Sequence, residues 1–386
     1  MLIGTKTMKI LNVNHTIDAV TGGGTAERPL QMSRHLIEGG IYCSILTMDQ
    51  GAAQRTLDGG KIIVIPSVSR RFHIPKFLFH GIRAAVKEAD IIHLMGHWTV
   101  LNALVYLVAR DQKKPYVFCP AGALPIFGRS RWLKKVYNTV IGKRIVRNAA
   151  KCIAITEAEK NHFKEYGIEE KAIVVIPNAV GEPEFCSNDD VGFRKRFGLS
   201  ERPFILFLAR LNLIKGPDLL LRAFCQLKDT FPGIDLVFAG PDDGMLAELK
   251  AIVNIGKAEE RVHFLGHIGG TDKSQAYRAA TLLAIPSRQE AMSLVVLEAG
   301  INGTPSVFTD QCGLEELAET GCGWMVPASI EGLKQGLTDA LSNPAQILAM
   351  KPSIRNAVIT KFSWHAIIQK YRHMYEELIK APPFNC

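Results

Sequence analysis

The chain lacks the features of a secreted, membrane-spanning or metal-binding protein. Its longest apolar stretch, Val100 to Ala109, contains Asn102 and falls far short of the ~20 residues that cross a bilayer. The opening MLIGTKTMKILNVNH has no secretory signal, so we expect a cytoplasmic protein. The eight cysteines form no Cys-x-x-Cys pair, which disfavours a zinc site or a disulfide framework. No Asp-x-Asp element ends a predicted strand, so neither a metal nor another cofactor is expected.

Acidic residues are scarce in the first half of the chain. Residues 1–180 hold 25 Lys/Arg and 13 Asp/Glu, a balance of +12, whereas residues 181–386 hold 21 and 24, a balance of −3. This asymmetry indicates an anionic partner for the first half, such as a membrane surface, a phosphorylated acceptor or nucleic acid. No recognised nucleic-acid module is present, so nucleic acid is the least favoured of the three.

The stretch from Arg129 to Lys151 holds eight Lys/Arg and no Asp or Glu. Basic residues mixed with aromatic ones are typical of a segment lying on anionic lipid. A solvated basic face, with its apolar stripe packed on the sheet, is the alternative. The predicted membrane or acceptor surface consists of Arg129, Arg131, Trp132, Lys134, Lys135, Lys143 and Arg144.

Short apolar runs alternate with helical patterns in both halves, which predicts parallel sheets covered by helices. The predicted fold is α/β, with two tandem Rossmann-like, doubly wound parallel-sheet domains. The expected strands are 9–14, 42–47, 61–65, 91–94, 116–119, 152–155 and 173–176, then 204–209, 235–239, 262–265, 282–285, 306–308 and 324–326.

Breaks in this alternation predict the domain boundaries. Residues 8–180 form the first domain, and the proline-containing stretch 181–203 reads as a linker. Residues 204–362 form the second domain. The helical pattern at 363–386 has no strand after it and is expected to cross back to the first domain.

Three loops carry candidate binding groups. Gly22-Gly23-Gly24 precedes a helix, where the backbone can approach an anion, but Glu27 stands where a dinucleotide fingerprint requires glycine. A merely flexible turn is an equal alternative. Arg210 and Lys215 follow a strand, where cations can neutralise a diphosphate or can simply be solvated.

The segment PSRQEAMSLVVLE leads from a strand into a helix, with Ser293 as the expected N-cap. Glu290 in the loop and Glu298 in the helix can accept hydrogen bonds from vicinal hydroxyls, and the N–H groups near Ser293 can hold a phosphate. Taken alone, the pair would be better explained as two ordinary exposed helical glutamates.

The order of the segments GGGTAER, ARLNLIKG, AGPDDG, VHFLGHI and PSRQEAMSLVVLEAGINGTP resembles glycosyltransferase family 4 over nearly the whole chain. The resemblance implies the two-domain GT-B architecture, a nucleotide-sugar donor and retention of anomeric configuration. It implies catalytic roles for Arg210, Lys215 and Glu290. The donor-binding residues that it implies are Gly23, Gly24, Arg210, Lys215, Gly240, His267, Glu290, Ala291, Met292, Ser293, Leu294 and Glu298.

Two departures from the family pattern matter. Ala291-Met292-Ser293 replaces a glycine-rich stretch, and Ala121 stands where many relatives have a histidine. His15, His93 and His97 lie near strand ends, where structural roles are favoured. The sequence therefore indicates no single proton-transferring residue. A phosphate oxygen of the donor can take the acceptor proton if the hydroxyl attacks from the side of the leaving group.

We expect a lipid-linked acceptor in surface polysaccharide or glycolipid synthesis, and a peripheral position on the inner face of the cell membrane. A transferase or epimerase acting on a small soluble sugar is an alternative. A non-catalytic GT-B partner subunit is another, disfavoured because Arg210, Lys215, Glu290 and Glu298 are all present.

Overall fold

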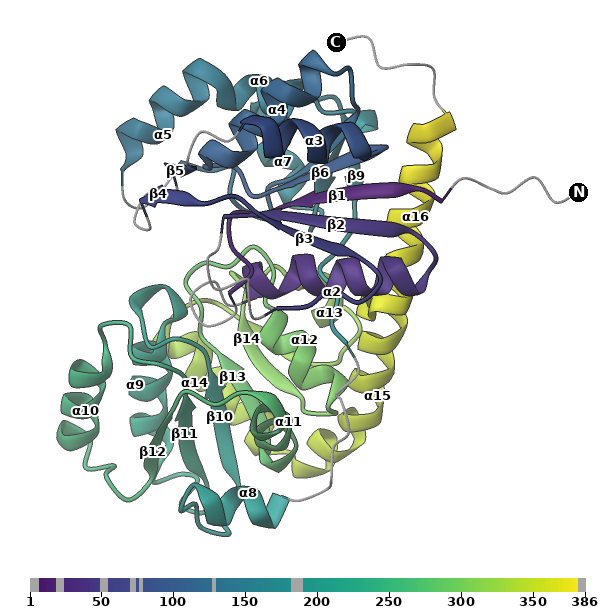
Figure 1. Cartoon of the computed structure of the whole chain (residues 1–386). Helices are drawn as coiled ribbons and strands as arrows, with labels where there is room; N and C mark the ends of the chain where they lie inside the picture. The colour runs from purple at the N-terminus through teal and green to yellow at the C-terminus, as the bar shows by residue number, and fades with distance from the viewer. Residues whose placement is uncertain are drawn as a thin grey trace, which may run out of the picture. The chain divides into compact units, whose positions relative to one another are not determined.

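The computed structural model describes residues 7–18, 24–48, 55–69, 74–75, 79–126, 130–181 and 190–380 (Figure 1). The chain divides into two compact units. The first holds the residues up to Asn178 together with those from Trp364 onward, and the second holds Ala179–Ser363. Each contains its own parallel sheet, which confirms the predicted pair of doubly wound α/β domains.

The first unit is built on a seven-stranded parallel sheet of order β3-β2-β1-β6-β7-β8-β9. Each of these strands lies within one residue of its predicted limits. A short antiparallel pair, β4 (Ser67–Ser69) and β5 (Ile74–Pro75), was not predicted. The seven strands are β1 (Lys9–Val13), β2 (Tyr42–Thr47), β3 (Lys61–Val64), β6 (Ile91–Met95), β7 (Tyr116–Cys119), β8 (Lys151–Ala154) and β9 (Ile173–Val175).

The two faces of this sheet differ in polarity because successive side chains point to opposite sides. Leu11 of β1 and Ile92 of β6 belong to an apolar core. On the opposite face, Asn12 donates to Ser33 of α2 at 2.8 Å and His93 bonds Tyr375 of α16 at 2.8 Å. The helices of the unit are α2 (Gly24–Glu38), α3 (Phe79–Glu88), α4 (Val100–Asp111), α5 (Arg131–Tyr137), α6 (Lys143–Arg147), α7 (Glu159–Glu165) and α16 (Trp364–Lys380), with a π-helical turn at Asn138–Gly142 and a 3₁₀ turn at Glu170–Ala172.

Helix α16 is the last described element of the chain and belongs to the first unit. It packs on α2, where the Trp364 ring stacks on His35 at a centroid distance of 5.5 Å. The hydroxyl of Tyr371 accepts a 2.8 Å hydrogen bond from the buried guanidinium of Arg28. Only Ser363 separates α16 from α15 of the second unit.

The second unit is built on a six-stranded parallel sheet of order β12-β11-β10-β13-β14-β15. Its core takes apolar side chains from the sheet and from helices such as α9 and α14. The strands are β10 (Phe204–Leu208), β11 (Asp235–Ala239), β12 (Val262–Gly266), β13 (Leu282–Ile285), β14 (Ser306–Thr309) and β15 (Trp324–Val326). The helices are α8 (Asp190–Arg196), the 3₁₀ turn η4 (Leu213–Lys215), α9 (Pro217–Leu227), α10 (Leu246–Ile255), α11 (Gly270–Ala279), α12 (Leu294–Ile301), α13 (Glu315–Ala318), α14 (Ile330–Leu341) and α15 (Pro344–Phe362).

Helix α8 lies inside the stretch 181–203 that we interpreted as a linker. It is part of the second unit, because Phe193 is fully buried and Arg194 donates to the carbonyl oxygens of Ser200, Arg202 and Ala279. One buried phenylalanine in a short helix leaves no periodic signal in the sequence. No helix in the described part of the chain is long and apolar enough to span a membrane.

Candidate functional site

The order of the strands in the second unit reverses at β10. The chain runs from β10 outward to β11 and β12, and then returns to the other side of β10 with β13. Loops that follow two such strands diverge at their carboxyl ends, and this is where open α/β sheets bind ligands. Arg210 and Lys215 follow β10, and Glu290 follows β13.

The loop after β10 is a tight turn that carries Lys215. The side chain of Asn212 caps η4 by accepting the N–H of Lys215 at 3.0 Å. Gly216 has a φ of +67°, and a Cβ added there would lie 2.1 Å from the carbonyl oxygen of Pro286. Only glycine permits this approach, so the loop after β10 lies directly against the loop after β13.

Lys215 and Glu290 form a direct ion pair. The ammonium Nζ lies 2.6 Å from Glu290 Oε1, and the glutamate side chain is only 10% exposed. Ser287 donates to the same oxygen at 2.6 Å. Both of these bonds fall on Oε1, and no described residue bonds Oε2, which can therefore accept from another donor such as a sugar hydroxyl.

The loop after β14 holds the Glu290 segment from its other side. The backbone N–H of Glu290 donates to the Gln311 carbonyl, and that of Ser293 donates to the Cys312 carbonyl, both at 2.9 Å. Gly313 comes so close that a Cβ there would lie 2.2 Å from the carbonyl oxygen of Ala291. The segment is therefore fixed by backbone contacts, which tolerate the Ala291-Met292-Ser293 sequence.

Ser293 stands at the N-cap of α12, as predicted, but its side chain does not cap the helix. It is fully buried, and its Oγ has no hydrogen-bond partner among the described residues. The first N–H groups of a helix lack intrahelical acceptors and favour an anion. The backbone of Leu294 begins the helix, while Met292 is 8% exposed and packs inward.

Glu298 lies on α12, one turn beyond the N-terminus. Its Oε2 accepts the Tyr277 hydroxyl at 2.7 Å and pairs with the Lys273 ammonium at 2.5 Å. Burial first, and then the Glu298 charge, raise the pKa of Tyr277, so the phenol stays a hydrogen-bond donor. Glu298 is 29% exposed, which leaves its other oxygen accessible.

Arg210 does not join the Lys215–Glu290 pair. Its guanidinium lies 3.2 Å from Asp243, which also accepts from Asn212 at 2.8 Å. Both charged partners are about half exposed, so the pair contributes little to stability and can open for a ligand. Gly240 directly follows β11 and has a φ of +149°, where a Cβ would lie 1.9 Å from the Ala209 carbonyl oxygen. His267, which follows β12, is exposed.

The first unit presents its candidate residues differently. Gly24 is exposed at the start of α2, while Gly23 lies outside the described residues. Ala121 has a φ of +49° in the turn after β7. The carboxylate of Glu159 holds this turn by accepting from the backbone N–H of Gly122 at 2.5 Å. Burial raises the pKa of Glu159, and the side chain is enclosed rather than available as a base.

The two strand-end histidines with described contacts are buried and neutral. His93 bonds Tyr375, and its pKa falls well below the usual value because of burial and, secondarily, the Arg28 charge. His97 lies 2.9 Å from Asn138 Oδ1, and burial lowers its pKa to about 4. Both contacts are within the fold, which fits the structural roles favoured from the sequence.

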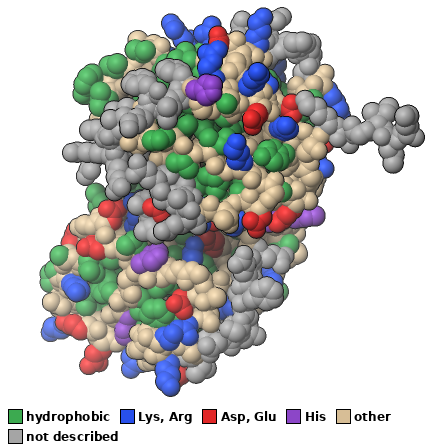
Figure 2. Space-filling view, in the orientation of Figure 1, with side chains coloured by type: hydrophobic (Ala, Val, Ile, Leu, Met, Phe, Trp, Pro, Cys, Tyr) green, Lys and Arg blue, Asp and Glu red, His purple; other side chains and the backbone are tan. Residues whose placement is uncertain are grey.

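The predicted basic surface lies on α5, α6 and the π-helical turn between them. Its member Trp132 is 67% exposed, and Val140, in the π-helical turn between the two helices, is 62% exposed. Figure 2 shows Lys and Arg side chains near hydrophobic ones in this part of the unit. The described basic members are Arg131, Lys134, Lys135, Lys143 and Arg144, whereas Arg129 lies outside the described residues.

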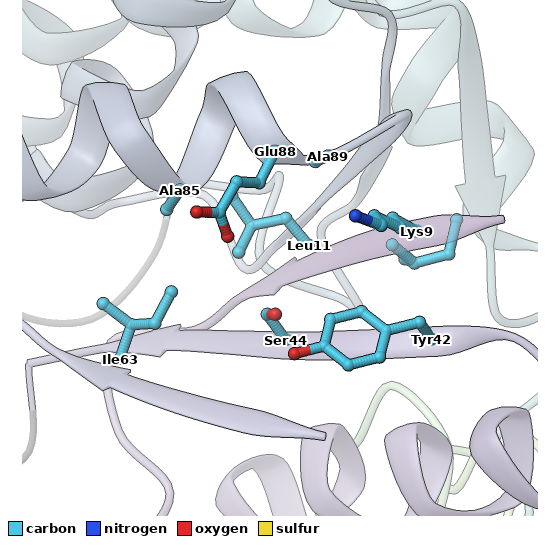
Figure 3. Close-up of a pocket in the computed structure, with 9 residues that line it drawn as sticks. Lys9, Leu11, Tyr42, Ser44, Ile63, Ala85, Glu88 and Ala89 are labelled. Carbon is cyan, nitrogen blue, oxygen red and sulfur yellow. The ribbon is translucent and has the colours of Figure 1, made fainter. Parts of the chain in front are cut away.

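A cavity of about 320 Å³ lies elsewhere in the first unit. Figure 3 shows it between α3 and the beginnings of β1 and β2, with Lys9, Tyr42 and Glu88 around it. The cavity thus lies at the amino ends of the strands, opposite their carboxyl ends, where the candidate binding loops begin.

Comparisons with known proteins agree with this arrangement. Residues 22–181 match the family model "Glycosyltransferase Family 4", and residues 192–357 match the model "Glycosyl transferases group 1". The chain belongs to glycosyltransferase family 4. This family 4 glycosyltransferase is 27% identical over 322 residues to D-inositol 3-phosphate glycosyltransferase of Actinosynnema mirum, covering 77% of this chain and 75% of the relative.

Solved glycosyltransferases share the fold over nearly the whole chain. Anabaena HepE, crystallised with UDP-glucose, aligns with a TM-score of 0.78 at 19% identity, covering 96% of this chain and 100% of that one. WaaG, a glycosyltransferase involved in lipopolysaccharide biosynthesis, aligns with a TM-score of 0.70 at 18% identity, covering 97% and 100%. These likenesses confirm the GT-B fold of the family 4 enzyme.

Several partners of the site residues were not predicted from the sequence. Ser287 binds Glu290, Asp243 binds Arg210, and Lys273 binds Glu298. Ser287 stands three residues before Glu290 in a motif that we did single out. Asp243 and Lys273 reach the site only through the parallel order of the strands, which their spacing in the sequence does not reveal.

Proposed function

We propose that this glycosyltransferase moves a sugar from a nucleotide-diphosphate donor to a hydroxyl acceptor, with retention of configuration. The observation that carries the proposal is the Lys215–Glu290 pair at the strand-order reversal, next to the N-terminus of α12. A cation, a half-satisfied carboxylate and free backbone N–H groups are the partners that a diphosphate and a sugar require. The shared fold of HepE, solved with UDP-glucose, supports this donor class.

In this proposal the second unit binds the donor. Lys215 and Arg210 neutralise the diphosphate, and Arg210 leaves Asp243 to do so. The N–H groups at the start of α12 and the Ser293 hydroxyl donate hydrogen bonds to a phosphate. Glu290 Oε2 accepts a hydrogen bond from a sugar hydroxyl. The remaining proposed contacts of the donor are between its ribose and Glu298, and between its base and the region of Gly240 and His267.

The proposed reaction needs no enzyme nucleophile. The acceptor hydroxyl approaches the anomeric carbon from the side of the leaving group. Its oxygen forms the new glycosidic bond as the bond from that carbon to the phosphate oxygen breaks. The hydroxyl proton passes to the departing diphosphate. Lys215 and Arg210 then act by positioning and by stabilising the charge that develops on the leaving group.

We further propose a lipid-linked acceptor in surface glycan or glycolipid synthesis, reached at the inner face of the cell membrane. The support is the exposed surface of α5 and α6, where Trp132 and Val140 lie among basic side chains. Such a surface binds anionic lipid through both charge and apolar contact. WaaG, which shares the fold, has a role in lipopolysaccharide biosynthesis.

A soluble sugar phosphate is the second candidate acceptor. It is favoured by the relatives named D-inositol 3-phosphate glycosyltransferase, which include a 24% identical protein of Acidothermus cellulolyticus that aligns with 92% of this chain. The positive balance of the first half of the chain suits either anionic acceptor.

Release of nucleoside diphosphate from UDP-, GDP- and ADP-sugars tests the proposal. The purified chain is assayed with D-inositol 3-phosphate, with a bacterial lipid extract, and with neither. We expect one nucleotide class to be cleaved, and cleavage to accelerate with the lipid extract. Acceleration by D-inositol 3-phosphate alone selects the second candidate. No cleavage of any nucleotide-sugar under all three conditions contradicts the proposed activity.

A further inference from the structure

We infer that Arg288 is a positioning residue that sets Lys215 against Glu290. This inference rests on the proposed function, in which that pair handles the donor. Arg288 stands in the loop after β13, two residues before Glu290, and its contacts run to the loop after β10.

Arg288 links the two loops through both its backbone and its side chain. The backbone N–H donates to the Ile214 carbonyl at 2.8 Å, and Nη1 donates to the Leu213 carbonyl at 2.8 Å. The guanidinium also forms a bidentate ion pair with Asp218, with Nη1 at 2.8 Å from Oδ1 and Nη2 at 2.7 Å from Oδ2. Asp218 stands in the first turn of α9, and its side chain is only 11% exposed.

The η4 turn has few other contacts that could fix it. Its Leu213 and Ile214 side chains are 61% and 46% exposed, so apolar packing does not hold the turn in place. Its other contacts among the described residues include the Asn212 cap, the bond from Asn212 to Asp243, the Lys215–Glu290 pair and the close approach of Gly216 to Pro286. Lys215 is the third residue of this turn. By binding the carbonyl oxygens of the two preceding residues, Arg288 therefore fixes the position of the Lys215 ammonium.

Arginine suits this task better than lysine. Its planar fork binds the two Asp218 oxygens and a backbone carbonyl at once, whereas an ammonium is a single point charge. Arg288→Lys retains the charge but loses the fork. A misplacement of about 1 Å in a group that acts on the transition state can lower turnover by up to about 100-fold.

The test is a pair of double-mutant comparisons. Arg288→Lys is made in the wild-type chain and in Lys215→Ala. Donor cleavage is measured, and the affinities for UDP, GDP and ADP are measured by calorimetry. In the wild-type background we expect turnover to fall at least about 10-fold and diphosphate affinity to fall several-fold. In the Lys215→Ala background we expect affinity to change by less than about twofold, because the group that Arg288 positions is gone.

Arg261→Lys is the matched control. Arg261 also binds a carboxylate and a backbone carbonyl, with Nε 2.9 Å from Asp235 and Nη2 3.1 Å from the Phe231 carbonyl oxygen. It stands just before β12, at the amino end of the sheet, and Asp235 begins β11. This variant should lower thermal stability as much as Arg288→Lys does, and leave turnover unchanged.

The outcomes separate the inference from the proposed function. Equal losses of affinity from Arg288→Lys in both backgrounds mean that Arg288 acts on the fold, and they overturn the inference alone. Wild-type turnover in Arg288→Lys, with Lys215→Ala impaired, also overturns the inference alone. Wild-type turnover and affinity in Lys215→Ala overturn the proposed function itself.

Discussion

The two units share one topology, but their polar side chains near the strand-order reversal are in different states. In the first unit several of these groups bond side chains of α16 or of the sheet. His93 bonds Tyr375, and Arg28 donates to Tyr371 and, at 3.2 Å, to the Cys119 sulfur. In the second unit, Glu290 uses one carboxylate oxygen and Ser293 Oγ has no described partner.

Helix α16 accounts for part of this difference. Two tyrosines of α16 reach the polar face of the first sheet and bond His93 and Arg28 there. His93 Nε2 and Asn12 Oδ1 still have no partner among the described residues, so buried atoms with unused hydrogen-bonding capacity are found in both units. What distinguishes the second unit is that Ser293 Oγ lies at the N-terminus of a helix, three residues from Glu290 of the Lys215–Glu290 ion pair, where an anion is favoured.

Substitution of the two glutamates should have the largest effect on transfer. The two variants should also distinguish the part of the donor site that binds the sugar from the part that binds the nucleotide. We expect Glu290→Ala to abolish transfer and leave affinity for the free nucleoside diphosphate nearly intact, because its partner is the sugar. Glu298→Ala should weaken nucleotide binding itself, because its partner is the ribose. Calorimetry with the nucleoside diphosphate distinguishes them. The reverse pattern would show that the two roles are wrongly assigned.

Substitution of Lys215 should have the second largest effect on turnover. We expect Lys215→Ala to lower turnover at least ~100-fold, the scale of losing one charge partner of a transition state. Arg210→Lys should also be impaired, because the guanidinium fork is lost. Steady-state rates at saturating donor provide the measurement, with Lys250→Ala on the exposed face of α10 as control. Wild-type rates in either variant would remove that residue from the mechanism.

Charge reversal on the basic surface should have a smaller effect, confined to the first unit. Arg131, Lys134 and Lys135 are changed together to glutamate, and binding to vesicles with and without anionic lipid is measured by co-sedimentation. We expect a loss of at least about 10-fold, since each cation near such a surface contributes about 1 kcal/mol and three of them are changed. Binding should also fall as salt rises.

The matched control changes three exposed lysines of the second unit, Lys195, Lys250 and Lys257, to glutamate. This variant should bind anionic vesicles as the wild type does. Equal binding of the wild type to neutral and anionic vesicles, or none to either, would favour a soluble acceptor.

The smallest expected effect concerns the buried His97. Its pKa is lowered to about 4 in the folded state. Between this pKa and that of the unfolded chain, the unfolded chain binds a proton at His97 and the folded protein does not. Stability is therefore complete above the unfolded pKa of about 6.5 and is lost as the pH falls toward 4. At pH 5 the loss from this group is about 2 kcal/mol.

Hydrogen exchange in β6 and α4, compared at pH 7.5 and pH 5 after correction for intrinsic rates, measures this loss within the first unit. His97→Gln should remove the His97 share of the pH dependence, and the exposed His365→Gln should leave it unchanged. An identical pH dependence in wild type and His97→Gln would show that His97 is not held neutral.

The sequence predicted the strands of the two parallel sheets well because most of them are short, mainly apolar and buried runs. It predicted the positions of Lys215 and Glu290 at strand ends, but not their mutual ion pair, which depends on β10 and β13 being neighbours. Arg288 stood in a quoted motif without a role, because its partners lie about 70 residues earlier in the chain. Helix α8 was missed because it is short and buries a phenylalanine without apolar periodicity, while its polar contacts depend on residues far away in the sequence, such as Ala279.

Nuclear magnetic resonance of the sugar released from the donor tests the central claim most directly. The anomer present in the first minutes is recorded before mutarotation, for the wild type, Lys215→Ala and Glu290→Ala. We predict that the wild type releases the anomer of the donor and that both variants release little or none. Release of the opposite anomer, or equal release by the variants, would contradict a retaining transfer carried by the Lys215–Glu290 pair.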